Sequence, residues 1–135
     1  MVTMTENPVR TELVVLDMAG TTVADDGLVE RAFRAALPDF TESDLAHVRA
    51  TMGESKITVF RHLTGGDEER ARDANTAFET AYADLVDRGH CAPLPGAERT
   101  LRRLREEGRV VALTTGFARD TQDRILAALG WRALV

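Results

Sequence analysis

The chain has 135 residues, of which 44% are hydrophobic and 29% are charged. This balance is ordinary for a folded domain and argues against a disordered chain. The formal net charge of −5 argues against a nucleic-acid-binding face, and no apolar run reaches the roughly 20 residues that span a bilayer. We therefore expect a small molecule as the partner, and neither nucleic acid nor a membrane.

The cysteine count and the N-terminal residues bear on the compartment of the protein. Cys91 is the only cysteine, so no internal disulfide can form, and the chain fits a reducing cytoplasm. Residues 1–11 are polar and include Pro8, which predicts a short mobile leader and not a signal peptide.

The first apolar run is Leu13 to Leu16, four branched residues without polar alternation. Such a run predicts a parallel strand covered on both faces. Ligands collect beyond the carboxyl ends of these strands, where Asp17 stands, followed by Gly20 and the Thr21 hydroxyl. The alternative is that Asp17 is only a turn former or a helix cap.

The middle of the chain has the apolar spacing of helices. Asp25 or Asp26 is expected to cap the first helix, and Thr41 with Asp44 forms a capping-box pattern before another. The helices are expected over about 27–37, 41–50, 54–63 and 67–88. The inner face of the last is expected to carry Ala74, Ala77, Phe78, Ala81, Tyr82 and Leu85.

The remainder reads as a return to an α/β arrangement. Residues 91–96 carry two prolines and predict a linker, and a helix is expected over 96–107. The run 110–113 predicts a second buried parallel strand, which again ends in small hydroxyl residues. A last helix is expected over 119–129, with Gly130 as its stop.

Helices between two buried strands predict an α/β core that is interrupted by an inserted all-helical cap. The expected division is residues 1–23 for the first part of the core, 24–92 for the cap and 93–135 for the second part of the core. A cap in this position would close over a site at the strand ends.

Lys56 is the second candidate for chemistry. A helix over 54–63 would place Met52, Val59 and Phe60 around its stem. Desolvation would then lower the pKa of Lys56 and make a neutral amine nucleophile available. The alternative is a solvated lysine whose stem lies over an amphipathic helix.

Two strings of residues carry a family resemblance. Asp17-Met18-Ala19-Gly20-Thr21-Thr22 resembles motif I of the haloacid dehalogenase-like superfamily. Ala19 stands where most members have a second acid, as in the phosphonoacetaldehyde hydrolase (phosphonatase) branch. Met52-Gly53-Glu54-Ser55-Lys56 resembles the cap motif of that branch. The branch has a histidine three residues after the lysine, and here Val59 stands there, which points to a phosphonatase-like relative.

The resemblance implies a partial Rossmann-like core and cleavage of the C–P bond of a 2-oxoalkyl phosphonate. Asp17 would be the nucleophile, Lys56 would form a Schiff base, and Thr115, or alternatively Thr114, would be the motif II hydroxyl. Mg²⁺ would be held by the Asp17 carboxylate and the Ala19 carbonyl. The expected substrate-binding residues are Gly20, Thr21, Met52, Gly53, Thr114 and Gly116.

The family's later motifs, a basic residue and further acidic metal ligands, have no counterpart before Val135. We therefore expect a C-terminally truncated chain that is inactive or nearly so alone and can associate with itself. Two other readings stay open. One is a phosphatase or phosphomutase for a small phosphate ester, against which Ala19 argues. The other is an inactive relative that acts as a binding or oligomerising module.

Overall fold

Two parallel strands, β1 (Leu13–Asp17) and β2 (Val110–Thr114), form the sheet of the computed structural model, which describes residues 9–135. Asp17 pairs in register with Thr114, so both strands end at the same edge. The prediction of two parallel strands with ligand-facing ends side by side is confirmed. The predicted polar leader falls mostly on residues 1–8, outside the described residues.

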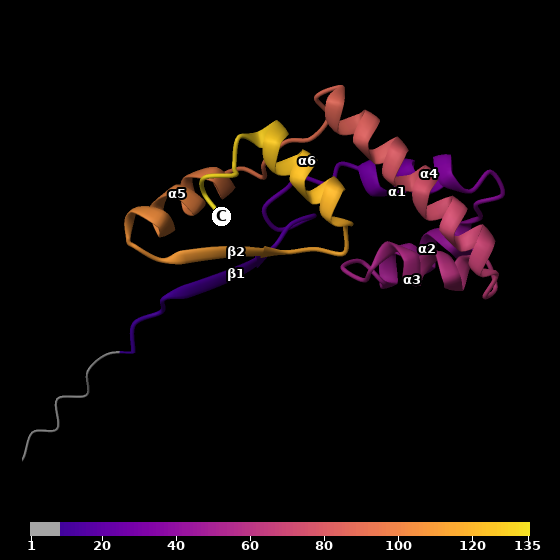
Figure 1. Cartoon of the computed structure of the whole chain (residues 1–135), viewed down its shortest axis with the longest axis horizontal. Coiled ribbons are helices and arrows are strands. Elements are labelled where there is room, and N and C mark those ends of the chain that lie inside the picture. Colours follow the sequence, from indigo (N-terminus) through magenta and orange to yellow (C-terminus); the bar gives the residue numbers. More distant parts are fainter. Residues whose placement is uncertain (1–8) are drawn as a thin grey trace, which may run out of the picture.

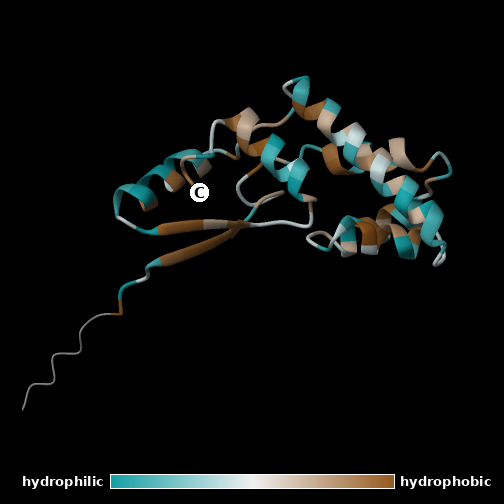
Figure 2. Cartoon of the chain, in the orientation of Figure 1, coloured by the Kyte–Doolittle hydropathy of each residue, from teal (hydrophilic) through white to brown (hydrophobic). Residues whose placement is uncertain are grey.

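The sheet is covered on one face only, and the prediction of strands covered on both faces was wrong. Val111 is 3% exposed, whereas Val15 is 52% and Val110 is 57% exposed. Helices α5 (Ala97–Glu106) and α6 (Arg119–Leu129) lie on the same side of the strands (Figure 1). No described element packs on the other face, and Figure 2 shows both strands as apolar.

Four helices gather at the other end of the elongated molecule (Figure 1). They are α1 (Leu28–Ala36), α2 (Glu42–Ala50), α3 (Lys56–Leu63) and α4 (Glu68–Asp87). An aromatic cluster joins three of them, because the ring centroid of Phe33 lies 4.8 Å from those of both Phe60 and Phe78. Burial of these rings contributes to the apolar stabilisation of the helical part.

The capping prediction for α2 is confirmed and that for α1 needs correction. The Thr41 hydroxyl accepts from the Asp44 N–H at 3.1 Å, and the Asp44 carboxylate accepts from the Thr41 N–H at 2.9 Å. Before α1, the capping position is Gly27, whose left-handed φ of 77° favours glycine. Asp25 still accepts a hydrogen bond from the Val29 N–H at 3.2 Å. Its carboxylate therefore pairs with an N–H of the first turn, although Asp25 is not the capping residue.

Two details of the helical part differ from the expected pattern. Helix α3 begins at Lys56 and not at Glu54, because Gly53, with φ of 96°, lies in a turn that α-helical backbone cannot include. On α4, Ala74, Phe78, Tyr82 and Leu85 are buried as predicted, whereas Ala77 is exposed.

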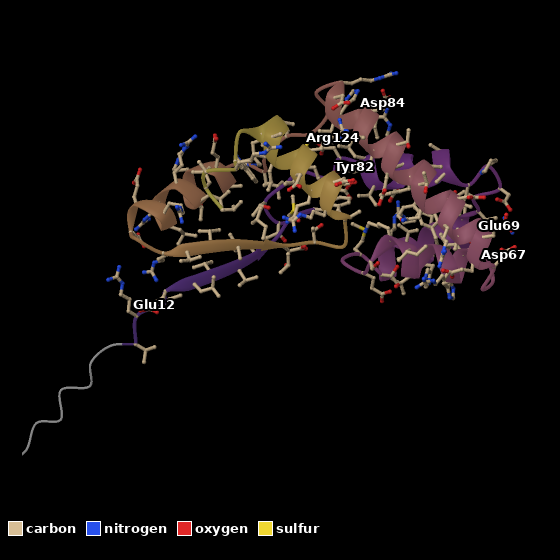
Figure 3. The ribbon with its side chains drawn as sticks, in the orientation of Figure 1. Glu12, Asp67, Glu69, Tyr82, Asp84 and Arg124 are labelled. Carbon is tan, nitrogen blue, oxygen red and sulfur yellow. The ribbon has the colours of Figure 1, made fainter. Side chains whose placement is uncertain are left out.

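Helix α6 connects the helical part to the sheet. Arg124 donates two hydrogen bonds of 3.1 Å to the Asp87 carboxylate at the end of α4. Figure 3 shows Arg124 beside the half of α4 that carries Asp84. The predicted bounds of α6 and its stop at Gly130, with φ of 69°, are confirmed. Within residues 9–135 no helix has both the length and the apolar character needed to cross a bilayer.

Candidate active site

Asp17 is the last residue of β1, and its side chain is exposed at the edge where both strands end. Its carboxylate oxygen Oδ1 accepts a hydrogen bond from the Met18 N–H at 2.9 Å. The buried Thr22 hydroxyl donates to the Asp17 carbonyl at 2.9 Å and so fixes the turn. The second carboxylate oxygen of Asp17 has no hydrogen-bond donor among the described residues, which leaves it open to a ligand.

The turn after Asp17 has the geometry expected of a loop that approaches a ligand. Gly20 has φ of 80°, a conformation that favours glycine, and its N–H donates to the Val23 carbonyl at 2.8 Å. Thr21 is exposed, and its hydroxyl is available at the surface. Both residues remain predicted substrate contacts.

Lys56 is the only lysine of the chain, which has 16 arginines. It is the first residue of α3 and only 7% exposed. Its Nζ atom lies 5.3 Å from the centroid of the Phe117 ring, and it has no ion pair within residues 9–135. Phe117 and the start of α3 therefore hold the amine at the junction of the helical part and the strand ends.

Burial lowers the pKa of Lys56 from its ordinary value of 10.5, and the negative charges of Asp25 and then Asp17 partly oppose this. Burial disfavours the ammonium form, because the charge loses solvation by water. The opposing effects also place both carboxylates within electrostatic reach of the amine. An amine with a lowered pKa is a better nucleophile at neutral pH.

The loop after β2 packs tightly against the turn before α3. The Lys56 backbone N–H donates to the Gly116 carbonyl at 3.3 Å. A Cβ atom on Gly116 would overlap the Glu54 carbonyl oxygen and lie 2.9 Å from the Gly53 carbonyl oxygen. Gly116 is thus the residue that permits this contact, and Gly53 lies at the same junction.

The expected role of Met52 in surrounding Lys56 was wrong. Met52 lies in the turn before α3 and is 41% exposed, because the helix does not extend back far enough to place it one turn before Lys56. Val59 and Phe60 are buried as expected. A substrate contact by Met52 remains a prediction.

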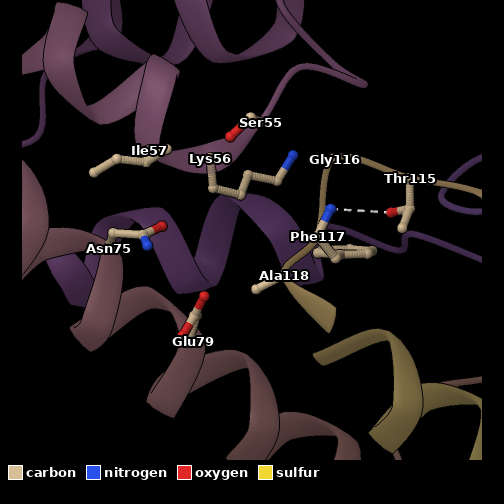
Figure 4. A pocket seen from close by; sticks show the side chains of 9 residues that line it. All are labelled: Ser55, Lys56, Ile57, Asn75, Glu79, Thr115, Gly116, Phe117 and Ala118. Atoms are coloured by element: carbon tan, nitrogen blue, oxygen red, sulfur yellow. Dashed lines mark hydrogen bonds between the residues drawn. The ribbon is translucent and has the colours of Figure 1, made fainter. Parts of the chain in front are cut away.

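The two candidate hydroxyls of motif II differ in position. Thr114 is the register partner of Asp17 and is exposed. Thr115 is half-buried, accepts the Phe117 N–H at 3.1 Å through its hydroxyl oxygen, and lines a cavity beside Lys56 (Figure 4). Both remain candidates, since each is close to one of the two predicted reactive side chains.

The cavity beside Lys56 has a volume of about 210 Å³, and Asp17 is not among its lining residues. It includes two residues of α4, Asn75 and Glu79, which the sequence analysis missed. An asparagine within an apolar helical pattern is the signal that could have found them, because asparagine is a poor helix former. Asp25 was assigned only to capping, yet its charge also acts on Lys56.

The described residues include no cluster of three or more His, Cys, Asp or Glu side chains suited to a metal ion. Asp17 has one carboxylate oxygen without a hydrogen bond at the strand ends, and Ala19, whose carbonyl is the other expected ligand, follows two residues later. Mg²⁺ is commonly bound through one or two carboxylates together with substrate phosphate oxygens and water. Two protein oxygens of this kind are therefore chemically compatible with a Mg²⁺ ion that also binds the substrate.

The sequence profile of the haloacid dehalogenase-like hydrolase family matches residues 11–135. The chain belongs to this family. The matching family is described as one of hydrolases, and Asp17 lies at the carboxyl ends of the strands, where ligands of open α/β sheets bind.

Relatives and a solved structure agree with the family assignment. A Bacteroides fragilis phosphonoacetaldehyde hydrolase is 29% identical over 87% of this chain and 51% of its own length. The "Uncharacterized protein in fgs 3'region" of Lacticaseibacillus casei is 30% identical over 90% of this chain and 57% of its own length. The crystal structure of a Pseudomonas syringae hydrolase superposes with a TM-score of 0.75 at 22% identity, over 90% of this chain and 56% of that one.

The structural likeness confirms the predicted fold, a partial α/β core with parallel strands and added helices. The chain spans about half the length of the curated relatives that it matches, 51% and 57%.

Proposed function

We propose that this haloacid dehalogenase-like chain is phosphonatase-like and cleaves the C–P bond of a small 2-oxoalkyl phosphonate. The observation that carries the proposal is the single buried lysine, Lys56, held at the strand ends within electrostatic reach of Asp17. A chain with 16 arginines keeps its one side-chain amine where an amine nucleophile would be needed. The likeness to phosphonoacetaldehyde hydrolase supports the same reading.

The division of the chain follows from this proposal. Under this proposal the described residues 9–23 belong to the core together with residues 93–135, and residues 24–92 form the cap that brings Lys56. The contact of Gly116 with Gly53 and Glu54 is the point where cap and core meet.

The chemistry divides between the two side chains. The neutral Lys56 amine condenses with the substrate carbonyl and releases water to give an imine, which takes up a proton from solvent to become an iminium ion. The Asp17 carboxylate attacks phosphorus while the C–P bonding electrons move to the iminium, forming an enamine and an aspartyl phosphate. Protonation and hydrolysis of the enamine return Lys56, and hydrolysis of the aspartyl phosphate releases phosphate and Asp17.

Mg²⁺, held by Asp17 and the Ala19 carbonyl, would neutralise charge between the carboxylate and the phosphonate oxygens. Thr114 or Thr115 would donate a hydrogen bond to a phosphonate oxygen. Ala19 leaves no acid beside Asp17 for an ester leaving group. The iminium replaces the need for one, because it accepts the electrons of the broken bond.

Borohydride reduction tests the imine directly and needs no turnover. Incubation of the chain with 2-oxoethyl phosphonate and borohydride should add one substrate residue to the intact mass. Lys56→Arg keeps a positive charge but cannot form the imine, so this variant should show no adduct beyond reaction at the α-amino group. Equal labelling of the variant and the unchanged chain would contradict the Schiff-base role.

The alternative is a phosphatase or phosphomutase for a small phosphate ester, which keeps Asp17 and gives Lys56 no covalent role. This alternative predicts that Lys56→Arg leaves ester hydrolysis intact while Asp17→Asn abolishes it. The same pair of variants therefore separates the two functions.

A further inference from the structure

The cavity beside Lys56 lies between three segments and is distinct from the exposed edge where Asp17 stands. Its lining comes from the start of α3, from α4 and from the loop after β2 (Figure 4). Lys56 borders the cavity, whereas Asp17 acts on Lys56 through its charge without lining the cavity. A molecule joined to Lys56 could therefore extend in two directions, toward Asp17 and into the cavity.

Two hydrogen-bond acceptors from α4 face this cavity. The Asn75 carbonyl oxygen Oδ1 is buried and has no hydrogen-bond partner among the described residues. Glu79, one helical turn later, has no ion pair within residues 9–135, and Figure 4 shows both side chains directed into the space beneath Lys56. Buried polar atoms in native proteins are nearly always paired, so an unpaired acceptor that faces a cavity suits a ligand that brings a donor.

The chemistry of the proposed imine gives this cavity an occupant. A carbonyl carbon joined to Lys56 carries two substituents, the methylene phosphonate and one other. In an aldehyde the other substituent is hydrogen, so no part of the substrate would occupy the cavity. In a ketone it is a carbon chain, and the volume of about 210 Å³ is below the roughly 300 to 1,000 Å³ of drug-sized sites, so this chain would be short.

We propose that the cavity lined by Asn75 and Glu79 receives the second substituent of a keto phosphonate, and that this substituent carries a hydroxyl or ammonium group. The donor of this group binds the Asn75 oxygen and the Glu79 carboxylate. The inference rests on the proposed Schiff base at Lys56 and adds a substrate class to it. Asn75 and Glu79 are then specificity residues, since they contact the substrate away from the reacting bonds.

A series of four carbonyl phosphonates tests the inference by borohydride trapping on the chain. The substituent opposite the phosphonate arm is hydrogen, methyl, hydroxymethyl or aminomethyl. Each trapping rate at Lys56 is divided by the rate with free Nα-acetyl-lysine, which corrects for the reactivity of the carbonyl. The hydroxymethyl or the aminomethyl compound should be trapped at least about tenfold faster than the methyl compound, which is worth about 1.4 kcal/mol.

Variants assign the preference to the cavity. Asn75→Leu removes the acceptor, and Glu79→Gln removes the charge with little change of shape. Asn75→Leu should erase the preference, and Glu79→Gln should reduce it, more for the aminomethyl than for the hydroxymethyl compound. Both variants should leave trapping of the methyl compound intact. Thr76→Leu is the matched control, because Thr76 is exposed on the same helix and outside the cavity, and the preference should survive it.

Three outcomes would overturn the inference. Equal corrected rates across the series would mean that the cavity holds only water. A preference that survives both Asn75→Leu and Glu79→Gln would place its origin elsewhere. Absence of a Lys56 adduct with all four compounds would contradict the proposed function itself, and the inference would fall with it. Equal trapping of all four would leave the proposed function standing.

Discussion

At the scale of single residues, Lys56 combines burial with the electrostatic influence of two carboxylates. Burial disfavours the ammonium form and lowers the pKa of Lys56, and the negative charges of Asp25 and Asp17 partly oppose this lowering. Such opposition is common at sites of acid–base or nucleophilic chemistry, where the pKa of a group is brought toward the working pH. A structural role alone would be served as well by a methionine or leucine at this position.

The lowered pKa of Lys56 predicts how stability changes with pH. The unfolded chain binds a proton at Lys56 up to about pH 10.5, whereas the folded chain releases it at lower pH. The unfolded state therefore holds more protons between these two values, and the free energy of unfolding rises with pH there. Lys56→Met should remove this rise and stabilise the fold at neutral pH.

Urea unfolding from neutral pH to about pH 10 measures this effect. Arg31→Met is the control, because Arg31 is exposed on α1 and its loss should leave the pH dependence unchanged. A Lys56→Met variant with the unchanged slope, or one less stable at neutral pH, would contradict the burial of a costly charge.

Gly116 gives a second prediction at this scale. Gly116→Ala should destabilise the fold by about 1 to 3 kcal/mol, because the added methyl group meets the Gly53 and Glu54 backbone. It should also slow imine trapping, since the loop that positions Lys56 must shift. Gly89→Ala is the comparison, because a Cβ there meets open space and only the positive φ of 81° is strained. Gly89→Ala should leave trapping unchanged.

At the scale of elements, what could be predicted depended on whether a residue's neighbours were close in sequence. The bounds of α6 followed from apolar spacing and Gly130, and the capping box of α2 from Thr41 and Asp44. The start of α3 did not follow, because Gly53 adopts a turn that packs on Gly116, far along the chain. Asn75 and Glu79 were missed because the residues that complete their cavity belong to other segments, the start of α3 and the loop after β2.

The aromatic cluster predicts a large effect for one substitution in α1. Phe33→Ala should lower the free energy of unfolding by about 3 to 5 kcal/mol, because it removes the ring that contacts both Phe60 and Phe78. Thermal or urea unfolding followed by circular dichroism measures the change. Ala35→Ser on the exposed side of α1 should cost less than about 1 kcal/mol. Similar effects of the two changes would contradict this account of the core.

At the scale of the whole molecule, the sheet presents an apolar face that the described residues leave uncovered. Leu13, Val15 and Val110 are each more than half exposed on it. Exposed strands with apolar side chains favour pairing with other chains. We therefore expect the chain to associate with itself as its concentration rises.

Substitutions on the two faces of the sheet should separate association from stability. Val15→Lys should reduce association with little loss of stability, because Val15 is 52% exposed. Val111→Thr should instead destabilise the fold by roughly 1 to 3 kcal/mol, because it buries a hydroxyl where Val111 is 3% exposed. Sedimentation velocity over a range of concentrations, together with urea unfolding, measures both. Unchanged association of Val15→Lys would show that another surface is responsible.

The most direct measurement asks whether Lys56 and Asp17 act on one substrate. Borohydride trapping at Lys56 is followed with 2-oxopropyl phosphonate and with butanone, a neutral ketone of similar reach, in the presence of Mg²⁺ and increasing inorganic phosphate. Phosphate should slow trapping of the phosphonate and leave that of butanone nearly unchanged, and Asp17→Asn should weaken the competition. A shared site would be contradicted if both ketones were trapped at the same rate relative to free Nα-acetyl-lysine and phosphate affected neither.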